Sequence, residues 1–383
     1  MGAFEHAIVL GSGMAGLVSA RVLSEHFDRV TIFEKDPNPE GPGFRNGIPQ
    51  GHHFHALIPG GLMIMAELFP GLQEDLKAAG SILPKPHEFY FYTPMGKSYA
   101  IGAFVPEPPP DTGAQVFFVQ TRGLLEYTIR SHVARIDNVE IVYNSGIKEL
   151  AVTDRRVTGI QLDSGEVVSA DLVIDAMGRQ GRTLSWLKGM GYPEPSEDVI
   201  TCDFAYSSVF MKPKDPSLFE DVGFFVSADP KGEHPRRGGA LVRMEDGTWL
   251  TSVGGRYGDY PPRDMEGFRA FVETLPDTSP YKELVRQCEP VDEIAHYRFP
   301  ANRRRHFEQL DEFPEGLLPI GDAICHYNPL YGQGMTAACR QAMALRATLA
   351  AAKQAGDSDG LWRSFFPEAY QETRAPWLFA AQA

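Results

Sequence analysis

Residues 7–34, AIVLGSGMAGLVSARVLSEHFDRVTIFE, decide the fold of this chain. A short apolar run leads into glycines at positions 11, 13 and 16, and apolar residues then recur at helical spacing. A second apolar run ends at Glu34, 18 residues after Gly16. The order strand, tight turn, helix, strand predicts a βαβ unit, and its glycine pattern is typical of dinucleotide-binding proteins.

Each residue type in this unit suits a bound pyrophosphate and ribose. Gly11 allows the sharp turn, Gly13 lets the backbone approach a phosphate, and Gly16 lets the helix pack on the strand. The helix start offers unpaired N–H groups, while Glu34 is placed to accept hydrogen bonds from ribose hydroxyls and would repel a 2′-phosphate. The simpler alternative is a glycine-rich turn beside a surface carboxylate. The residues expected to bind the cofactor here are Gly11, Gly13, Met14, Ala15, Gly16, Glu34 and Lys35.

The bulk composition is that of a globular protein with an acidic surface. Its 383 residues predict two or three lobes. The formal net charge of -14 lacks the basic footprint of a nucleic-acid-binding protein. No uninterrupted apolar segment reaches the length of a membrane span, and the first residues lack the zones of a signal peptide. We expect a cytoplasmic protein with free thiols and no bound metal, because no metal-finger spacing connects Cys202, Cys288, Cys325 and Cys339.

Two later segments also carry strand signals. Residues 147–175 alternate apolar runs with turn residues, which predicts a β-meander that ends in the buried strand 172–174. Apolar residues 316–320 predict another buried strand. It leads into the triplet Gly-Asp-Ala at 321–323 and then into an Ala-rich helix that ends at Gly356.

With these blocks in place, the chain resembles the FAD-dependent monooxygenases of the p-hydroxybenzoate hydroxylase fold. It is most similar to the bacterial branch that includes polyether epoxidases and other tailoring enzymes of natural-product pathways. The resemblance spans nearly the whole chain. It depends on GSGMAG at 11–16 with Glu34, RNGIPQGHHFHAL at 45–57, DLVIDAMGRQGRT at 171–183 and LPIGDAICHYNPLYGQGMTAA at 318–338.

The resemblance implies FAD as the cofactor and gives individual residues a role. Asp322 would bind the ribityl and pyrophosphate portion, Arg122 would contact FAD from the start of a helix at 122–129, and the loop 332–335 would lie along the isoalloxazine. No side chain is expected to act as acid or base. The further residues implied as cofactor-binding are Arg45, His53, Arg122, Asp175, Gly178, Gly321, Asp322, Gly334 and Met335, and the flavin-side loop comprises Pro329, Gly332, Gln333, Gly334 and Met335.

The resemblance also implies a reaction. FAD would be reduced by NADPH or NADH, directly or through a partner flavin reductase, and one oxygen atom of O₂ would enter an apolar polyene or aromatic substrate. The middle motif, DAMGR at 175–179, departs from the Asp-Gly motif followed by Ser and Arg that helps related hydroxylases to use NADPH. The alternatives are a flavin-dependent dehydrogenase or double-bond reductase and a flavin-binding subunit without its own turnover. A halogenase is disfavoured because no Trp-x-Trp-x-Ile-Pro motif occurs.

The predicted architecture is α/β, with a Rossmann-like FAD-binding domain and an inserted, mainly antiparallel substrate sheet. Strands are expected at 202–211 and 241–253, the latter turning at 246–247. Half of the aromatic residues in this sheet should be plain core, because alternate residues face opposite sides. Relatives in this branch generally continue past the end of this chain, so we expect its tail to be incomplete and to lack a helical closing element. The boundaries are 1–75, 112–185 and 295–365 for the FAD-binding domain, 76–111 and 186–294 for the substrate domain, and 366–383 for a helical tail.

Three further patterns have competing interpretations. His52, His53 and His55 form either a polar loop beside the flavin or a metal or covalent flavin site. The pattern GDSDG at 356–360 imitates a serine-hydrolase motif, but it follows a helix, so a helix cap and turn are favoured. The basic run 303–305 is either a site for an acidic substrate or carrier-protein phosphopantetheine, or a set of local ion pairs.

Overall fold

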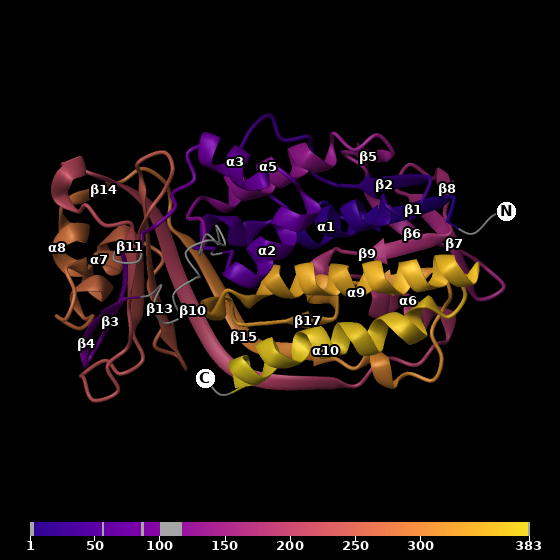
Figure 1. Ribbon diagram of the computed structural model, residues 1–383. Coiled ribbons are helices and arrows are strands. Elements are labelled where there is room, and N and C mark those ends of the chain that lie inside the picture. Colours follow the sequence, from indigo (N-terminus) through magenta and orange to yellow (C-terminus); the bar gives the residue numbers. More distant parts are fainter. Residues whose placement is uncertain (1–3, 56, 86–87, 100–116, 382–383) are drawn as a thin grey trace.

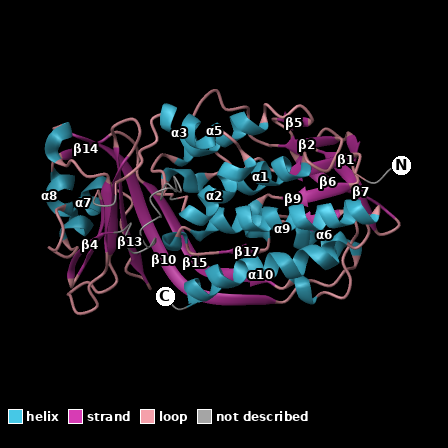
Figure 2. Cartoon of the chain, viewed as in Figure 1, coloured by secondary structure: helices cyan, strands magenta, loops and turns pink. Residues whose placement is uncertain are grey.

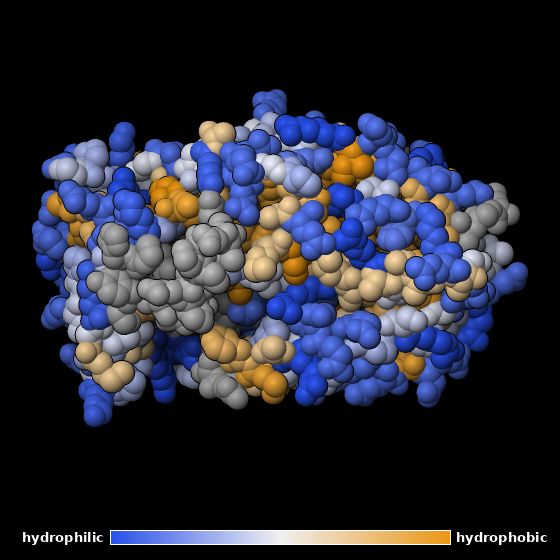
Figure 3. All heavy atoms as spheres, viewed as in Figure 1, coloured by the Kyte–Doolittle hydropathy of each residue, from blue (hydrophilic) through white to orange (hydrophobic). Residues whose placement is uncertain are grey.

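The computed structural model describes residues 4–55, 57–85, 88–99 and 117–381. The molecule is elongated, with an α/β part at one end and a large, strongly twisted sheet at the other (Figure 1). Most helices gather over the α/β part (Figure 2). On the face drawn in Figure 3 that part is mainly hydrophilic, and apolar surface occurs in small separate areas.

The α/β part contains a five-stranded sheet in the order β16-β9-β1-β2-β5. Every neighbouring pair is parallel, so the predicted Rossmann-like arrangement is confirmed. Strands β1, β9 and β16 are buried along their whole length, as parallel strands covered by helices must be. The bounds of the five strands are His6–Leu10 for β1, Arg29–Phe33 for β2, Val139–Val142 for β5, Leu172–Asp175 for β9 and Leu317–Pro319 for β16.

Helices surround this sheet and bury its apolar faces. The Ala-rich helix α9 packs on α1 and α2, and α10 lies on the outer side of α9. Gly356, with φ +69°, ends α9 in a left-handed cap, as the sequence predicts. The helices of this part are α1 (Met14–Leu23), α2 (Pro59–Leu68), α3 (Leu72–Ala78), α5 (Arg122–Val133), α6 (Thr183–Met190), α9 (Gln333–Ala355) and α10 (Leu361–Ala381).

The predicted β-meander forms a separate antiparallel sheet. Its strands β6 (Ile147–Thr153), β7 (Arg156–Leu162) and β8 (Val167–Ser169) pair in sequence order. The chain then enters the buried strand β9 in the centre of the parallel sheet. The glycine turn and the strand that follows the meander therefore reach the same edge of the parallel sheet.

The large sheet has the strand order β17-β15-β10-β13-β12-β11-β3-β4, with β14 paired to β10. All of these pairs are antiparallel except β11 with β3, so the expectation of a mainly antiparallel sheet is confirmed. Helices α7 (Met265–Glu273) and α8 (Tyr281–Arg286) cover its distal face. The strands are β3 (Phe89–Thr93), β4 (Gly96–Tyr99), β10 (Glu197–Pro213), β11 (Gly223–Val226), β12 (Gly238–Arg243), β13 (Trp249–Arg256), β14 (Cys288–Pro290), β15 (Ala295–Arg305) and β17 (Cys325–His326).

The two parts share more chain than the predicted boundaries suggest. β15 pairs with β10 in the large sheet, although its residues are predicted to belong to the cofactor domain. Helix α10 runs without a break across position 365, where the tail was expected to begin. Both differences come from long-range packing, which alternation along one strand or one helix does not reveal.

Candidate cofactor site

The glycine turn between β1 and α1 is as tight as its sequence predicts. Gly11 has φ +91°, a conformation that side chains disfavour, and its N–H donates to the carbonyl of Phe33 at 2.8 Å. A Cβ on Gly16 would lie 2.0 Å from the Gly11 carbonyl oxygen, so no side chain fits there. The two glycines bring α1 directly onto the turn.

Beyond the turn, the start of α1 is free to bind an anion. Gly13 is the N-cap residue, no side chain caps the helix, and no acidic residue lies in its first turn. A Cβ on Gly13 would have only the Ile48 Cδ1 atom within 4 Å, at 3.9 Å. The exposed N–H groups and this open approach fit a phosphate that contacts the backbone. Met14 is buried and Ala15 is half-buried behind them.

Glu34 lies at the end of β2 and is 5% exposed. Its carboxylate accepts hydrogen bonds from Ser12 N at 2.9 Å, Ser12 Oγ at 2.6 Å and Asp36 N at 2.9 Å. Burial alone would raise the pKa of Glu34, but these hydrogen bonds and the charge of Arg45 hold that pKa at about 2. The group is therefore an anion fixed beside the glycine turn. Lys35, the next residue, points to solvent.

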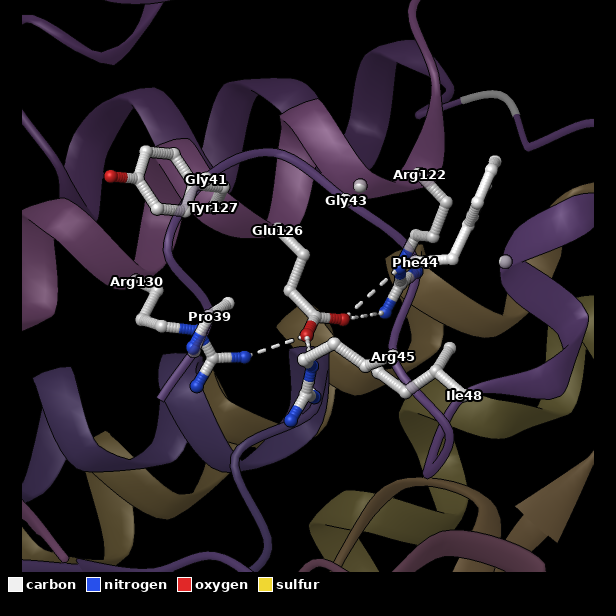
Figure 4. Close-up of a pocket in the computed structure, with 12 residues that line it drawn as sticks. Pro39, Gly41, Gly43, Phe44, Arg45, Ile48, Arg122, Glu126, Tyr127 and Arg130 are labelled. Atoms are coloured by element: carbon white, nitrogen blue, oxygen red, sulfur yellow. Dashed lines mark hydrogen bonds and ion pairs between the residues drawn. The ribbon is translucent and has the colours of Figure 1, made fainter. Parts of the chain in front are cut away.

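Three arginines converge on one carboxylate next to this turn (Figure 4). Glu126 on α5 accepts from Arg45 Nε at 2.8 Å, from Arg122 Nη2 at 3.1 Å and from Arg130 Nη2 at 2.7 Å. Arg130 also donates to the Ser12 hydroxyl at 2.6 Å. Arg45 and Arg122 were expected at the site, whereas Glu126 and Arg130 were missed. Their signal was the i, i+4, i+8 spacing of Arg122, Glu126 and Arg130, which puts them on one helix face.

Asp322 follows β16 and faces the glycine turn from the other side. Gly321 has φ +68°, and a Cβ there would lie 2.8 Å from the Cβ of Ala15, so the two motifs touch. None of the described residues donates a hydrogen bond to the Asp322 carboxylate. Burial raises the pKa of Asp322 to about 6, although Arg179 and Arg122 act in the opposite direction. A carboxylate held here without a partner fits the hydroxyl groups of a ribityl chain.

The loop after Asp322 prepares the start of α9. Asn328 accepts a hydrogen bond from Leu330 N at 3.1 Å and caps the short turn Pro329–Tyr331. Gly332 then adopts φ +61°, and no side chain caps α9. Among the described residues, no atom lies within 4 Å of a Cβ placed on Gly334. Uncapped N–H groups beside open space fit a planar ring that gains negative charge on reduction.

Arg122 connects the two halves of the site. The Arg122 Nη1 atom lies 2.8 Å from Met335 Sδ at the start of α9. Gln120 is buried, and both polar atoms of its amide lack a hydrogen-bond partner among the described residues. A buried amide without partners is costly, so Gln120 is a further candidate contact that the sequence did not single out.

The middle motif shapes a turn beside Asp322. The buried carboxylate of Asp175 accepts from Met177 N at 3.1 Å and from Thr183 N and Oγ1 at 3.0 and 2.6 Å. These bonds use both of its oxygens within the protein. Gly178, with φ +68°, lies against Asp322, and a Cβ there would be 3.9 Å from the Cβ of that residue. A direct cofactor contact by Asp175 stays a prediction, and its observed contacts give it a role in holding the turn.

The three histidines of the 52–55 loop occupy different surroundings. His52 stacks on Phe44 with ring centroids 4.0 Å apart, and His55 Nδ1 lies 2.9 Å from the His53 carbonyl oxygen. His53 faces the large sheet, where its Nδ1 lies 2.8 Å from Ser208 Oγ. Burial lowers the pKa of His53 to about 3 and that of His55 to about 4. Within the described ranges no group of His, Cys, Asp and Glu is placed to hold a metal ion.

We predict that FAD is held without a covalent bond, because the candidate site offers groups for both the phosphate and the ribose and covalent attachment is not required. Acid precipitation of the purified holoprotein should release yellow flavin into the supernatant. The measurement is the absorbance of both fractions near the flavin maximum. Flavin that stays in the pellet would contradict the prediction and would point to His53 or His55 as the linking residue.

The basic run, the GDSDG pattern and the cysteines near the site have structural roles. All three arginines of the run 303–305 form ion pairs with Glu197 or Asp198 across the β10–β15 ladder. In the GDSDG pattern, Asp359 is paired with Arg156. Cys325 and Cys339 are buried, and burial raises the pKa of each thiol to about 12, so both are inert. No helix in the described part is long and apolar enough to cross a bilayer.

The structure has two parts, a Rossmann-like parallel sheet and a mainly antiparallel sheet, and the candidate cofactor site lies between a glycine turn and a Gly-Asp motif. A family model described as an NAD(P)-binding Rossmann-like domain matches residues 9–56. Protein Rv3254 of Mycobacterium tuberculosis (strain ATCC 25618 / H37Rv) is 34% identical over 368 residues, which cover 93% of this chain and 75% of that protein. The chain therefore belongs to the family of Protein Rv3254.

Solved structures share the fold at low sequence identity. PqsL of Pseudomonas aeruginosa, a probable FAD-dependent monooxygenase, has a TM-score of 0.71 at 16% identity, over 98% of this chain and 94% of that chain. The flavin-dependent brominase Bmp2 has a TM-score of 0.72 at 16% identity, over 98% and 86%. A flavoprotein/dehydrogenase of Cytophaga hutchinsonii has a TM-score of 0.70 at 18% identity, over 98% and 84%. The fold thus occurs in flavoproteins with different reactions.

Proposed function

We propose that this chain is an FAD-dependent monooxygenase that inserts one oxygen atom of O₂ into a largely apolar small molecule. Epoxidation or hydroxylation in natural-product biosynthesis is the role we favour. The observation that carries the proposal is the Asp322 carboxylate, which has no partner in the described residues and lies where the Gly-Asp turn meets α1. It supplies the acceptor that a flavin nucleotide would need at its ribityl chain, opposite the free start of α1.

Bound FAD would supply the two-electron chemistry and the activation of O₂. The protein would bind and orient it. The start of α1 is suited to the pyrophosphate and Glu34 to the ribose, because one offers N–H donors and the other a fixed anion. The uncapped start of α9 is suited to a developing negative charge, since its N–H groups are oriented before the reaction.

Aromatic side chains on the face of the large sheet toward the cofactor domain favour an organic substrate. Phe210 contacts Phe44 with ring centroids 5.5 Å apart, and Phe225 contacts Phe54 at 5.4 Å. Phe224 and Trp249 pack instead in the core under α7 and α8. The aromatic rings that face the cofactor domain would exclude water from a reaction with O₂.

A flavin-dependent dehydrogenase or double-bond reductase is the second candidate, because the same fold occurs in a protein named as a dehydrogenase. NADPH, NADH or a partner flavin reductase would supply electrons to either enzyme. The two candidates differ in whether oxygen enters the product.

We predict that the product of turnover carries one atom of molecular oxygen. The holoprotein would be incubated with NADPH and a flavin reductase, ¹⁸O₂, and a panel of polyene and aromatic substrates, and products would be read by mass spectrometry. A mass gain of one labelled oxygen is expected. A product changed only by two hydrogens would assign the chain to the dehydrogenases or reductases, and label that enters from water instead would indicate hydration.

A further inference from the structure

A hydrogen-bonded row of side chains lies where the large sheet meets the cofactor domain. His53 is 3% exposed and Ser208, on β10, is 1% exposed. His53 Nδ1 lies 2.8 Å from Ser208 Oγ, which lies 2.6 Å from Ser252 Oγ on β13. Since Ser208 and Tyr206 are two residues apart on one strand, both point to the same face of the sheet. The row therefore fixes the imidazole beside the Tyr206 ring.

Two polar atoms of this cluster have no hydrogen-bond partner among the described residues. The rings of His53 and Tyr206 meet edge to face with centroids 4.4 Å apart. Neither His53 Nε2 nor the Tyr206 hydroxyl forms a hydrogen bond to any described residue. His53 and Tyr206 are 3% and 8% exposed, and neither polar atom is sealed from solvent, so a ligand or a water molecule can reach and complete the pair.

The surrounding groups connect the pair to the proposed flavin position. Tyr297 lies against both rings, with centroids 5.6 Å from Tyr206 and 6.0 Å from His53. Its hydroxyl accepts a hydrogen bond from Arg179, whose charge also acts on Asp322. The pair thus lies on the side of the sheet that faces the Gly-Asp motif.

The charge state of the pair limits what it binds. Burial, together with the other nearby histidines, lowers the pKa of His53 to about 3, and burial raises the pKa of Tyr206. Both groups are neutral at physiological pH. With Ser208 bonded to one ring nitrogen, the pair offers a neutral imidazole nitrogen and a hydroxyl, which suit an uncharged oxygen better than a carboxylate or a phosphate.

We propose that His53 and Tyr206 form a subsite for an uncharged hydroxyl or carbonyl oxygen of the organic substrate. This inference rests on the proposed function, because it places the substrate between the large sheet and the cofactor. It refines the expected substrate from a purely apolar molecule to one that carries a neutral oxygen group on an apolar or aromatic body. His53 and Tyr206 are positioning residues in this assignment.

The test compares 2-naphthol with naphthalene, which share an aromatic body and differ in one hydroxyl group. Binding to the FAD-loaded protein would be followed by flavin absorbance and calorimetry without a reductant. We expect 2-naphthol to bind about tenfold more tightly than naphthalene, as one neutral hydrogen bond allows. Tyr206→Phe and His53→Gln should remove most of this difference and leave naphthalene binding unchanged. Tyr192→Phe, whose hydroxyl donates to the Arg155 carbonyl oxygen in the α/β part, is the matched control.

Several outcomes would overturn the inference. Equal binding of the two probes by the unaltered protein would mean that water completes the pair, and binding of neither probe would remove the subsite. Equal loss of both probes in Tyr206→Phe would show a packing role only. The binding assay needs no turnover, so its result does not depend on the oxygenation reaction. Failure to incorporate ¹⁸O would contradict the proposed function and would leave the binding test of the subsite undecided.

Discussion

Gly16→Ala is expected to destabilise the ligand-free protein by about 3 kcal/mol, at the upper end of the cost of forcing one methyl group into a packed site. The added Cβ would lie 2.0 Å from the Gly11 carbonyl oxygen, and that atom belongs to the backbone of the turn. The turn and α1 must therefore move apart. Urea denaturation followed by circular dichroism would measure the loss.

Gly334→Ala is the matched control, because the same methyl group enters open space. The ligand-free protein should keep its stability or gain up to about 1 kcal/mol, since alanine favours helix over glycine. Affinity for FAD should fall at least tenfold in this variant, because the methyl group would occupy space assigned to the flavin. Equal stability losses in the two variants would contradict the packing argument, and unchanged FAD affinity in Gly334→Ala would contradict the position of the flavin.

Asp322→Asn is expected to weaken FAD binding about tenfold to a hundredfold, the range for a hydrogen bond to a charged acceptor. The measurement is titration of the ligand-free protein with FAD, followed by quenching of flavin fluorescence. Asp359→Asn, at an exposed ion pair with Arg156, should change FAD affinity little. Equal affinity in Asp322→Asn and the unaltered protein would remove Asp322 from the site.

The same variant has a predicted effect on pH dependence without any cofactor. Burial raises the pKa of Asp322 from 3.8 to about 6, so the folded chain holds this proton more tightly than the unfolded chain. Its contribution to stability is therefore present at low pH and is lost as the pH rises through about 6. The unaltered protein should lose stability as the pH rises from 3.8 to about 6, whereas Asp322→Asn has no such group to titrate. The difference in unfolding free energy between the two proteins should therefore change over this pH range. A constant difference from pH 4 to 7 would contradict the raised pKa.

Local sequence patterns predicted the parallel sheet because each of its signals is contained in a short segment. The glycine spacing specifies the turn at Gly11, and the apolar run 172–174 specifies the buried strand β9. The ion pair between Arg45 and Glu126 could not be predicted in the same way, because 81 positions separate the partners. The sequence indicated the helix face that carries Glu126, but it did not indicate that the loop carrying Arg45 packs against this face.

The second part was harder to delimit for the same reason. Alternation predicted strands near 202–211 and 241–253, yet it gave no indication that β15 pairs with β10 or that β3 pairs in parallel with β11. His53 illustrates the limit at the level of the site. Its place in a histidine-rich loop suggested flavin contact, and only the fold shows that its imidazole is fixed by Ser208 on the large sheet.

Strand β10 has a mechanical consequence. It is 17 residues long and pairs with β15 from Glu197 to Ser208, with a register shift between Thr201 and Phe204 (Figure 1). Because this one ladder runs beside the α/β part and continues into the large sheet, the two parts cannot swing apart as hinged bodies without breaking its backbone hydrogen bonds. Small molecules must therefore enter and leave through rearranging loops and side chains, while the distance between the two cores stays nearly constant.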